Sequence, residues 1–169
     1  MPFPQEFFDL KDIEHKELFL ETEEVWTVLD RLKDYLASFF GSSWPLAGIN
    51  GQIEKTLVID KGNVRHDLEV KPTGPKGAIQ VYEKGTIIEG CTVIMAGACL
   101  FDDRVILGAG TVVEPGALIK GPTVIGNNTE VRQGAYMRGT CLVGNGCVVG
   151  HATEMKSSVL LDDAKAAHF

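Results

Sequence analysis

Three basic side chains recur at a constant interval in the second half of the sequence. Lys120, Arg138 and Lys156 are equally spaced, and His168 follows Lys156 by two thirds of the same interval. In a fold that repeats at this interval, such side chains lie on neighbouring strands about 4.8 Å apart. Cations stacked this closely repel one another unless an anion lies between them. The spacing therefore predicts a phosphate site, and the alternative is a row of solvated charges that face outward.

This interval is three times a shorter repeat that begins at residue 83. From there the sequence divides into consecutive units of six residues. Their first position is apolar from Met95 to Leu161, and their fifth is mostly Val, Cys, Thr or Ala. A period of six fits neither an α-helix, which repeats near 3.6 residues, nor a hairpin sheet, but it fits the three-sided coils of a parallel β-helix. Glycines that recur once in every three units are expected to mark one corner of the prism: Gly90, Gly108, Gly126 and Gly144.

The first half of the chain has a different pattern. Residues 22–40 predict an amphipathic helix, with Thr22 at its start and Gly41 as its C-cap. Its apolar stripe consists of Val25, Leu29, Leu32 and Leu36. We expect this helix to bury its apolar side chains against its own chain or against a neighbouring subunit. The predicted segments are a helical one at 1–50, a linker with one or two strands at 51–82, and the β-helix at 83–169.

Composition excludes several classes of protein. The 169 residues carry a net charge of −7 with a pI near 5.1, which opposes nucleic-acid binding because that requires a basic surface. No run of about 18 apolar residues predicts a membrane span, and the N-terminus lacks a signal-peptide pattern, so a cytoplasmic location is expected. The four cysteines form no CxxC pair and are expected to be buried, reduced thiols. No metal site is expected.

The repeat resembles that of the hexapeptide-repeat acyltransferases, whose fold is a left-handed parallel β-helix. Residues 136–169, "YMRGTCLVGNGCVVGHATEMKSSVLLDDAKAAHF", are similar to the acetyltransferase half of the bifunctional enzymes that acetylate glucosamine 1-phosphate and make UDP-N-acetylglucosamine. They are also similar to the C-terminal β-helices of related sugar-1-phosphate nucleotidyltransferases. The resemblance implies a homotrimer that binds a sugar phosphate or UDP-sugar and uses acetyl-CoA as co-substrate.

The resemblance also implies roles for individual residues. Arg138 and Lys156 match substrate-binding positions, with Lys120 as a further member of their row and Arg132 as a secondary contact. His168 would be the general base that takes a proton from the attacking sugar amine, a role suited to a pKa near 6.5. His151 lies outside the matched pattern and is expected to be a surface or interface side chain.

The sequence also departs from that family. The family pattern continues after the histidine with a tyrosine- and glycine-containing segment and further coils, which supply sugar contacts and the acetyl-CoA groove. No glycine-rich nucleotidyltransferase motif is present near the N-terminus. We therefore expect this chain to be incomplete for acetyl transfer and unable to make UDP-sugars by itself.

Two other functions compete with acetyl transfer. One is a trimeric scaffold that binds a sugar nucleotide without catalysis. The other is a metal-dependent carbonic anhydrase of the γ type, which shares the fold but requires three converging histidines. The four histidines of this chain include no close pair.

Overall fold

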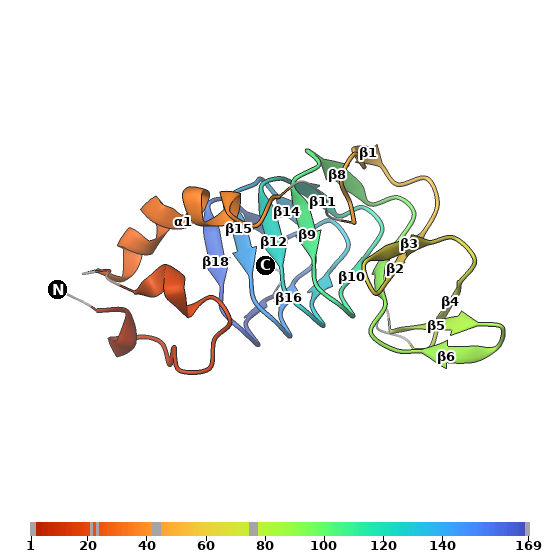
Figure 1. The fold of residues 1–169 in the computed structure, drawn as a ribbon, viewed down its shortest axis with the longest axis horizontal. Helices are drawn as coiled ribbons and strands as arrows, with labels where there is room; N and C mark the ends of the chain where they lie inside the picture. The colour runs from red at the N-terminus through yellow and green to blue at the C-terminus, as the bar shows by residue number, and fades with distance from the viewer. Residues whose placement is uncertain (1–2, 21, 23, 42–44, 75–77, 168–169) are drawn as a thin grey trace.

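Three parallel sheets form the sides of a β-helix in the second half of the chain (Figure 1). The computed structural model describes residues 3–20, 22, 24–41, 45–74 and 78–167. Sheet A stacks β8 (Cys99–Phe101), β11 (Leu118–Lys120), β14 (Tyr136–Met137) and β17 (Glu154–Met155). Sheet B stacks β7 (Thr92–Ile94), β10 (Val112–Val113), β13 (Glu130–Val131), β16 (Val148–Val149) and β19 (Lys165–Ala166). Sheet D stacks β9 (Val105–Leu107), β12 (Thr123–Ile125), β15 (Cys141–Val143) and β18 (Ser158–Leu160). The parallel β-helix expected from the repeat is confirmed.

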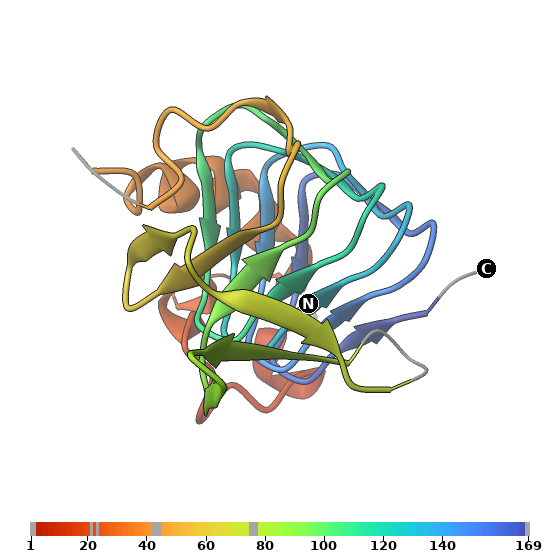
Figure 2. The same ribbon diagram turned by 90° about the vertical axis from the view of Figure 1, so that its right-hand side faces the viewer.

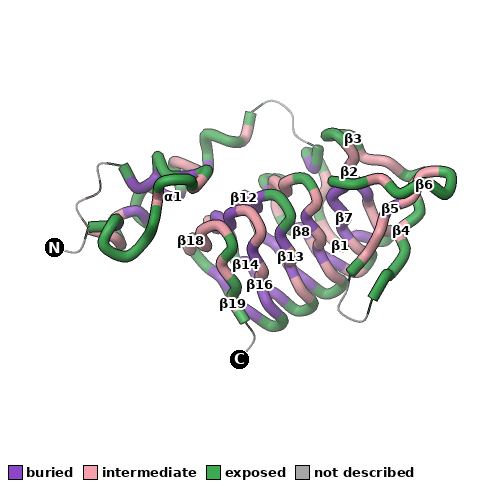
Figure 3. The backbone as a smooth tube through the Cα atoms, turned by 90° about the horizontal axis from the view of Figure 1, so that it is seen from below, coloured by how far each residue is buried: buried purple, intermediate pink, exposed green. Residues whose placement is uncertain are grey.

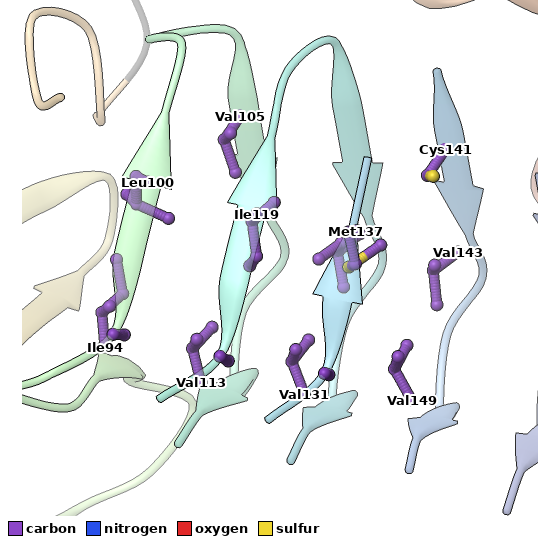
Figure 4. Packing of buried hydrophobic residues seen from close by; sticks show 14 of the residues in the cluster. Ile94, Leu100, Val105, Val113, Ile119, Val131, Met137, Cys141, Val143 and Val149 are labelled. Atoms are coloured by element: carbon purple, nitrogen blue, oxygen red, sulfur yellow. The ribbon is translucent and has the colours of Figure 1, made fainter. Parts of the chain in front are cut away.

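The inside of the prism is filled by one apolar residue from each strand, as Figure 4 shows. Ile119 and Met137 on sheet A, and Val113 and Val131 on sheet B, have no exposed surface. Alternate side chains of a strand point to opposite faces, so the next residue in each strand faces outward. The predicted inward first position is therefore correct through the middle of the β-helix.

The repeat is not uniform at its two ends. Leu100 pairs with Ile119, one residue beyond the regular interval, whereas Leu142 pairs with Val159, one residue short of it. The first coil therefore contains one extra residue, and the last coil lacks one. As a result Leu100 points inward and Phe101 is 45% exposed, contrary to the uninterrupted division into sixes. Met95 and Leu161 likewise pack outside the central core.

Small polar residues at the fifth position satisfy the backbone inside the prism. The Thr111 hydroxyl donates to the Gly126 carbonyl at 2.7 Å, and the Thr129 hydroxyl donates to the Gly144 carbonyl at 2.9 Å. In the next coil the Cys147 thiol donates to the Leu161 carbonyl at 3.0 Å. Each side chain thus links its own coil to the following one. At Gly126 the coils approach so closely that a Cβ would lie 2.6 Å from the Gly144 carbonyl carbon, so only glycine fits there.

Antiparallel strands cover the first coil, as Figure 2 shows. In this region β1 (Gly51–Gln52) pairs with β8, and β2 (Leu57–Asp60) pairs with both β7 and β3 (Asn63–Arg65). A separate antiparallel sheet C contains β4 (Glu69–Pro72), β5 (Ile79–Glu83) and β6 (Thr86–Ile88). The expected linker with one or two strands is therefore mostly strand, and parallel stacking begins at β7. Strand pairing compensates for the breakers Gly62, Pro72 and Gly74, which are confined to turns and strand ends.

The N-terminal segment contains η1 (Pro4–Glu6), η2 (Lys16–Phe19), η3 (Val25–Thr27) and α1 (Val28–Ala37). The helix is shorter than the expected 22–40, and the Thr22 hydroxyl bonds to the Phe19 carbonyl instead of capping it. Its buried stripe is Val28, Leu32 and Leu36. This stripe packs on Val124 and Leu142, which face outward from sheet D. The helix is therefore packed against its own chain.

Candidate functional site

Neighbouring coils align the predicted cations on one side of the β-helix. Lys120 is the last residue of β11, and Arg138 and Lys156 directly follow β14 and β17 in the same sheet. Ile119 pairs with Met137, and Met137 pairs with Met155, so the three cations follow three consecutive residues in register. The Arg138 amide also donates to the Met155 carbonyl at 2.8 Å. Their equal spacing therefore places Lys120, Arg138 and Lys156 in one row, here named the cation row.

Arg138, at the centre of the cation row, already has an acidic partner. Its guanidinium donates to the Glu154 carboxylate at 2.7 Å, and this bond raises the pKa of Arg138. Both side chains are well exposed, 43% for Arg138 and 58% for Glu154. An exposed ion pair is weak because water and salt screen it. A ligand phosphate can therefore displace Glu154 or bind beside it at little cost.

An aromatic ring also lies among the cations. The Tyr136 ring centroid is 5.5 Å from the Lys120 ammonium and 6.0 Å from the Arg138 guanidinium. Cations at these distances are attracted by the face or rim of the ring. Tyr136 therefore reduces the repulsion between neighbouring coils, and its half-buried ring offers an apolar surface beside the charges.

The two lysines of the cation row differ from Arg138 because neither forms an ion pair with another described residue. Lys120 is half-buried and Lys156 is exposed. The described part of the row therefore has three positive charges against one carboxylate. In a protein with a net charge of −7 this local excess is a favourable place for an anion.

Arg132 lies in a different sheet. It follows β13 in sheet B and is held by Glu130, with guanidinium to carboxylate contacts of 2.9 and 2.7 Å. The structure thus does not bring Arg132 into the cation row. His168, the expected general base, lies outside the described residues, and its role stays a prediction.

The remaining histidines are engaged in local contacts. His15 is buried, and its Nδ1 lies 3.0 Å from the Tyr35 hydroxyl. His151 is exposed, and its Nδ1 lies 2.7 Å from the Gln133 carbonyl oxygen. Among the residues that the structure describes, no three His, Cys, Asp or Glu side chains are arranged to hold a metal ion.

The four cysteines are free thiols. Burial raises the pKa of Cys91, Cys141 and Cys147 above the ordinary value of a thiol. The ionised form, which is the nucleophile, is therefore suppressed at neutral pH. This fits the expectation that these cysteines are packing residues.

Glu154 and Tyr136 were not identified from the sequence as parts of the site. A usable signal was present, because each precedes a cation of the row by two residues. Residues two apart on a strand lie on the same face. Glu154 therefore shares a face with Lys156, and Tyr136 shares one with Arg138.

Comparison with known proteins adds no relative. No protein family matches the sequence, and no curated protein or solved structure is matched by it. The fold itself defines the class, a parallel β-helix protein with an N-terminal helical segment. No helix in the described ranges is both long enough and apolar enough to cross a bilayer.

Proposed function

We propose that this protein is a hexapeptide-repeat β-helix of the acyltransferase type that binds a phosphate-bearing sugar at the cation row. The observation that supports it is the register of Lys120, Arg138 and Lys156 on three neighbouring coils. Guanidinium and ammonium groups spaced by one strand separation suit the oxygens of a phosphate or diphosphate. The sugar would then lie beside Tyr136, whose ring is the apolar surface nearest to the charges.

Within this proposal the reaction is acetyl transfer from acetyl-CoA to an amino-sugar phosphate. The amine nitrogen attacks the thioester carbonyl, the carbon–sulfur bond breaks, and coenzyme A leaves. His168 would accept the proton that the amine loses. The cation row would hold the phosphate and fix the position of the amine.

A second candidate function is binding of the same sugar phosphate or UDP-sugar without catalysis. It is favoured by the composition of the row. Its described side chains comprise three cations, a carboxylate paired with Arg138 and an aromatic ring. These groups bind an anion, but none of them is an unpaired base or an activated nucleophile.

Ligand-dependent thermal stability tests the proposal. Glucosamine 1-phosphate and UDP-N-acetylglucosamine should raise the melting temperature, whereas neutral N-acetylglucosamine should have a much smaller effect. A ligand at 100 times its Kd adds about 2.7 kcal/mol to the free energy of unfolding. Arg138→Ala should abolish the shift.

Lys71→Ala is the matched control. Lys71 lies 3.0 Å from Glu69 and 4.9 Å from the Tyr82 ring centroid, so it has the same kinds of neighbours as Arg138 but lies in sheet C. This variant should respond to the phosphates as the parent does. Equal shifts in the parent and in Arg138→Ala would contradict the proposed site.

Acetyl-CoA-dependent acetylation of glucosamine 1-phosphate distinguishes the two candidate functions. Turnover that requires both Arg138 and His168 supports the transferase. Phosphate-dependent stabilisation without turnover supports the binding protein.

A further inference from the structure

An outward row of aliphatic side chains runs along sheet D beneath the N-terminal segment. Its four members occupy the middle of successive strands and are aligned by strand pairing: Ile106, Val124, Leu142 and Val159. Val124 and Leu142 are buried, at 5% and 1% exposure, because Leu32 and Leu36 of α1 cover them. Each coil therefore presents one branched aliphatic residue to the N-terminal segment.

The N-terminal segment extends beyond the last strand of this sheet. In Figures 1 and 3 its short helices lie past β18, on the side away from β15. There an apolar groove of about 560 Å³ separates them from the last coil. One wall contains Phe8, Trp26 and Leu29, and the other is formed by residues 157–161. Trp26 and Leu29 are 53% and 43% exposed, whereas Leu32, one turn further along the helix, is fully buried.

The floor of the groove is the edge of a sheet. β18 is the terminal strand in the order β18-β15-β12-β9, and among the described residues no strand pairs with its outer edge. An open strand edge supplies backbone hydrogen bonds to an added strand, and an adjacent apolar pocket selects the side chain that the added strand carries. A purely apolar ligand would fill the groove but leave this edge unused.

We propose that the groove is a docking site for an extended β-strand of a partner polypeptide. The strand pairs with β18 in the parallel sense shared by all pairs of sheet D. Its middle residue continues the outward aliphatic row and fits between Trp26 and Leu29.

The pattern of the occupant follows from the strands already present. Each strand of sheet D with a fully buried interior places a small residue, an outward aliphatic residue and an inward aliphatic residue in succession. Thr123, Val124 and Ile125 of β12 show this order. A partner strand of the type Thr-Val-Ile, with no charge at the central position, therefore fits the edge and the groove.

Trp26 fluorescence tests the proposal, because this side chain lines the groove. The sequence contains two tryptophans, so a Trp44→Phe variant makes Trp26 the single emitter. The probe is a peptide with the sequence of residues 117–134, which contains no tryptophan and carries Thr-Val-Ile at its centre. We expect a saturable blue shift of Trp26 emission as the peptide excludes water from the groove.

Two controls define the expected selectivity. The same peptide with Asp in place of Val124 should produce no shift, because a charge would enter an apolar groove. In the protein, Leu29→Glu should abolish peptide binding, whereas Ile87→Glu should not. Ile87 has a similar exposure of 48% but lies in sheet C, and circular dichroism should show that both variants are folded.

Three results would overturn the proposal. One is an equal blue shift with the Asp peptide, or no saturable shift with either peptide. Another is a shift produced by dodecanoate when the peptide has no effect, which would assign the groove to a lipid chain. The third is a blue shift that grows with protein concentration without peptide, together with self-association in sedimentation, which would make a second copy the occupant.

Discussion

Glu154 is the side chain that most affects how the cation row binds an anion. It occupies one guanidinium nitrogen of Arg138 and therefore competes with any phosphate for the same donor. We predict that Glu154→Gln strengthens binding of glucosamine 1-phosphate by roughly two- to five-fold, the range expected for loss of one exposed ion pair. Isothermal titration calorimetry at low and high salt measures this. Weaker binding by the variant would show that Glu154 positions Arg138 and does not compete with the ligand.

The buried thiols predict how stability depends on alkaline pH. Burial raises the pKa of Cys141, whereas an unfolded thiol ionises near pH 8.5. The stabilisation is therefore fully present below pH 8.5. At higher pH the unfolded state loses protons that the folded state retains, so stability falls by up to about 1.4 kcal/mol per pH unit for each such thiol.

Cys141→Ala tests this pH dependence. The variant should show a smaller loss of stability between pH 8 and pH 10 than the parent, measured by urea denaturation. Between pH 6 and pH 8 the difference between the two proteins should stay constant, because neither state ionises there. A slope unchanged by the substitution would contradict the assignment to Cys141.

At the scale of elements, α1 is held by the part of its surface that covers sheet D. We predict that Leu32→Ala costs about 2 to 5 kcal/mol, because it leaves a cavity above Val124 and Leu142. Leu29→Ala, in the exposed turn before it, should cost less than about 1 kcal/mol. Chemical denaturation compares the two variants. Similar costs would show that the helix does not depend on its contact with the β-helix.

The strands depend on the alternation between inside and outside. Val131→Asp places an unpaired charge inside the prism and should cost several kcal/mol. Val148 faces outward on the neighbouring strand and is half-buried, so Val148→Asp is the matched control and should be much better tolerated. Thermal melting of both variants tests the assignment. If Val131→Asp melted like the parent, Val131 would not point inward.

At the scale of the whole molecule, the homotrimer stays a prediction, but the structure restricts its interface. The N-terminal segment covers the outer face of sheet D, so subunits must meet through the outer faces of sheets A and B. We expect sedimentation at micromolar concentration to show a particle of three 18.3-kDa chains. A single species of one chain would contradict the trimer and any site that depends on two subunits.

Much of this molecule follows from the sequence because a β-helix is a local repeat. Each coil contacts only its neighbours, so one constant interval fixes both the inward positions and the alignment of Lys120, Arg138 and Lys156. The same regularity predicted Val113, Val131 and Met137 in the core. No knowledge of distant contacts was needed for these assignments.

The tertiary structure decided what the periodic pattern does not encode. One extra residue in the first coil turned Phe101 outward, because side chains alternate and a shift of one residue reverses the face. The packing of α1 on sheet D and the groove beside β18 depend on contacts between residues far apart in the chain. The Arg138–Glu154 pair joins side chains of neighbouring coils diagonally, so its geometry depends on rotamers that spacing alone does not specify.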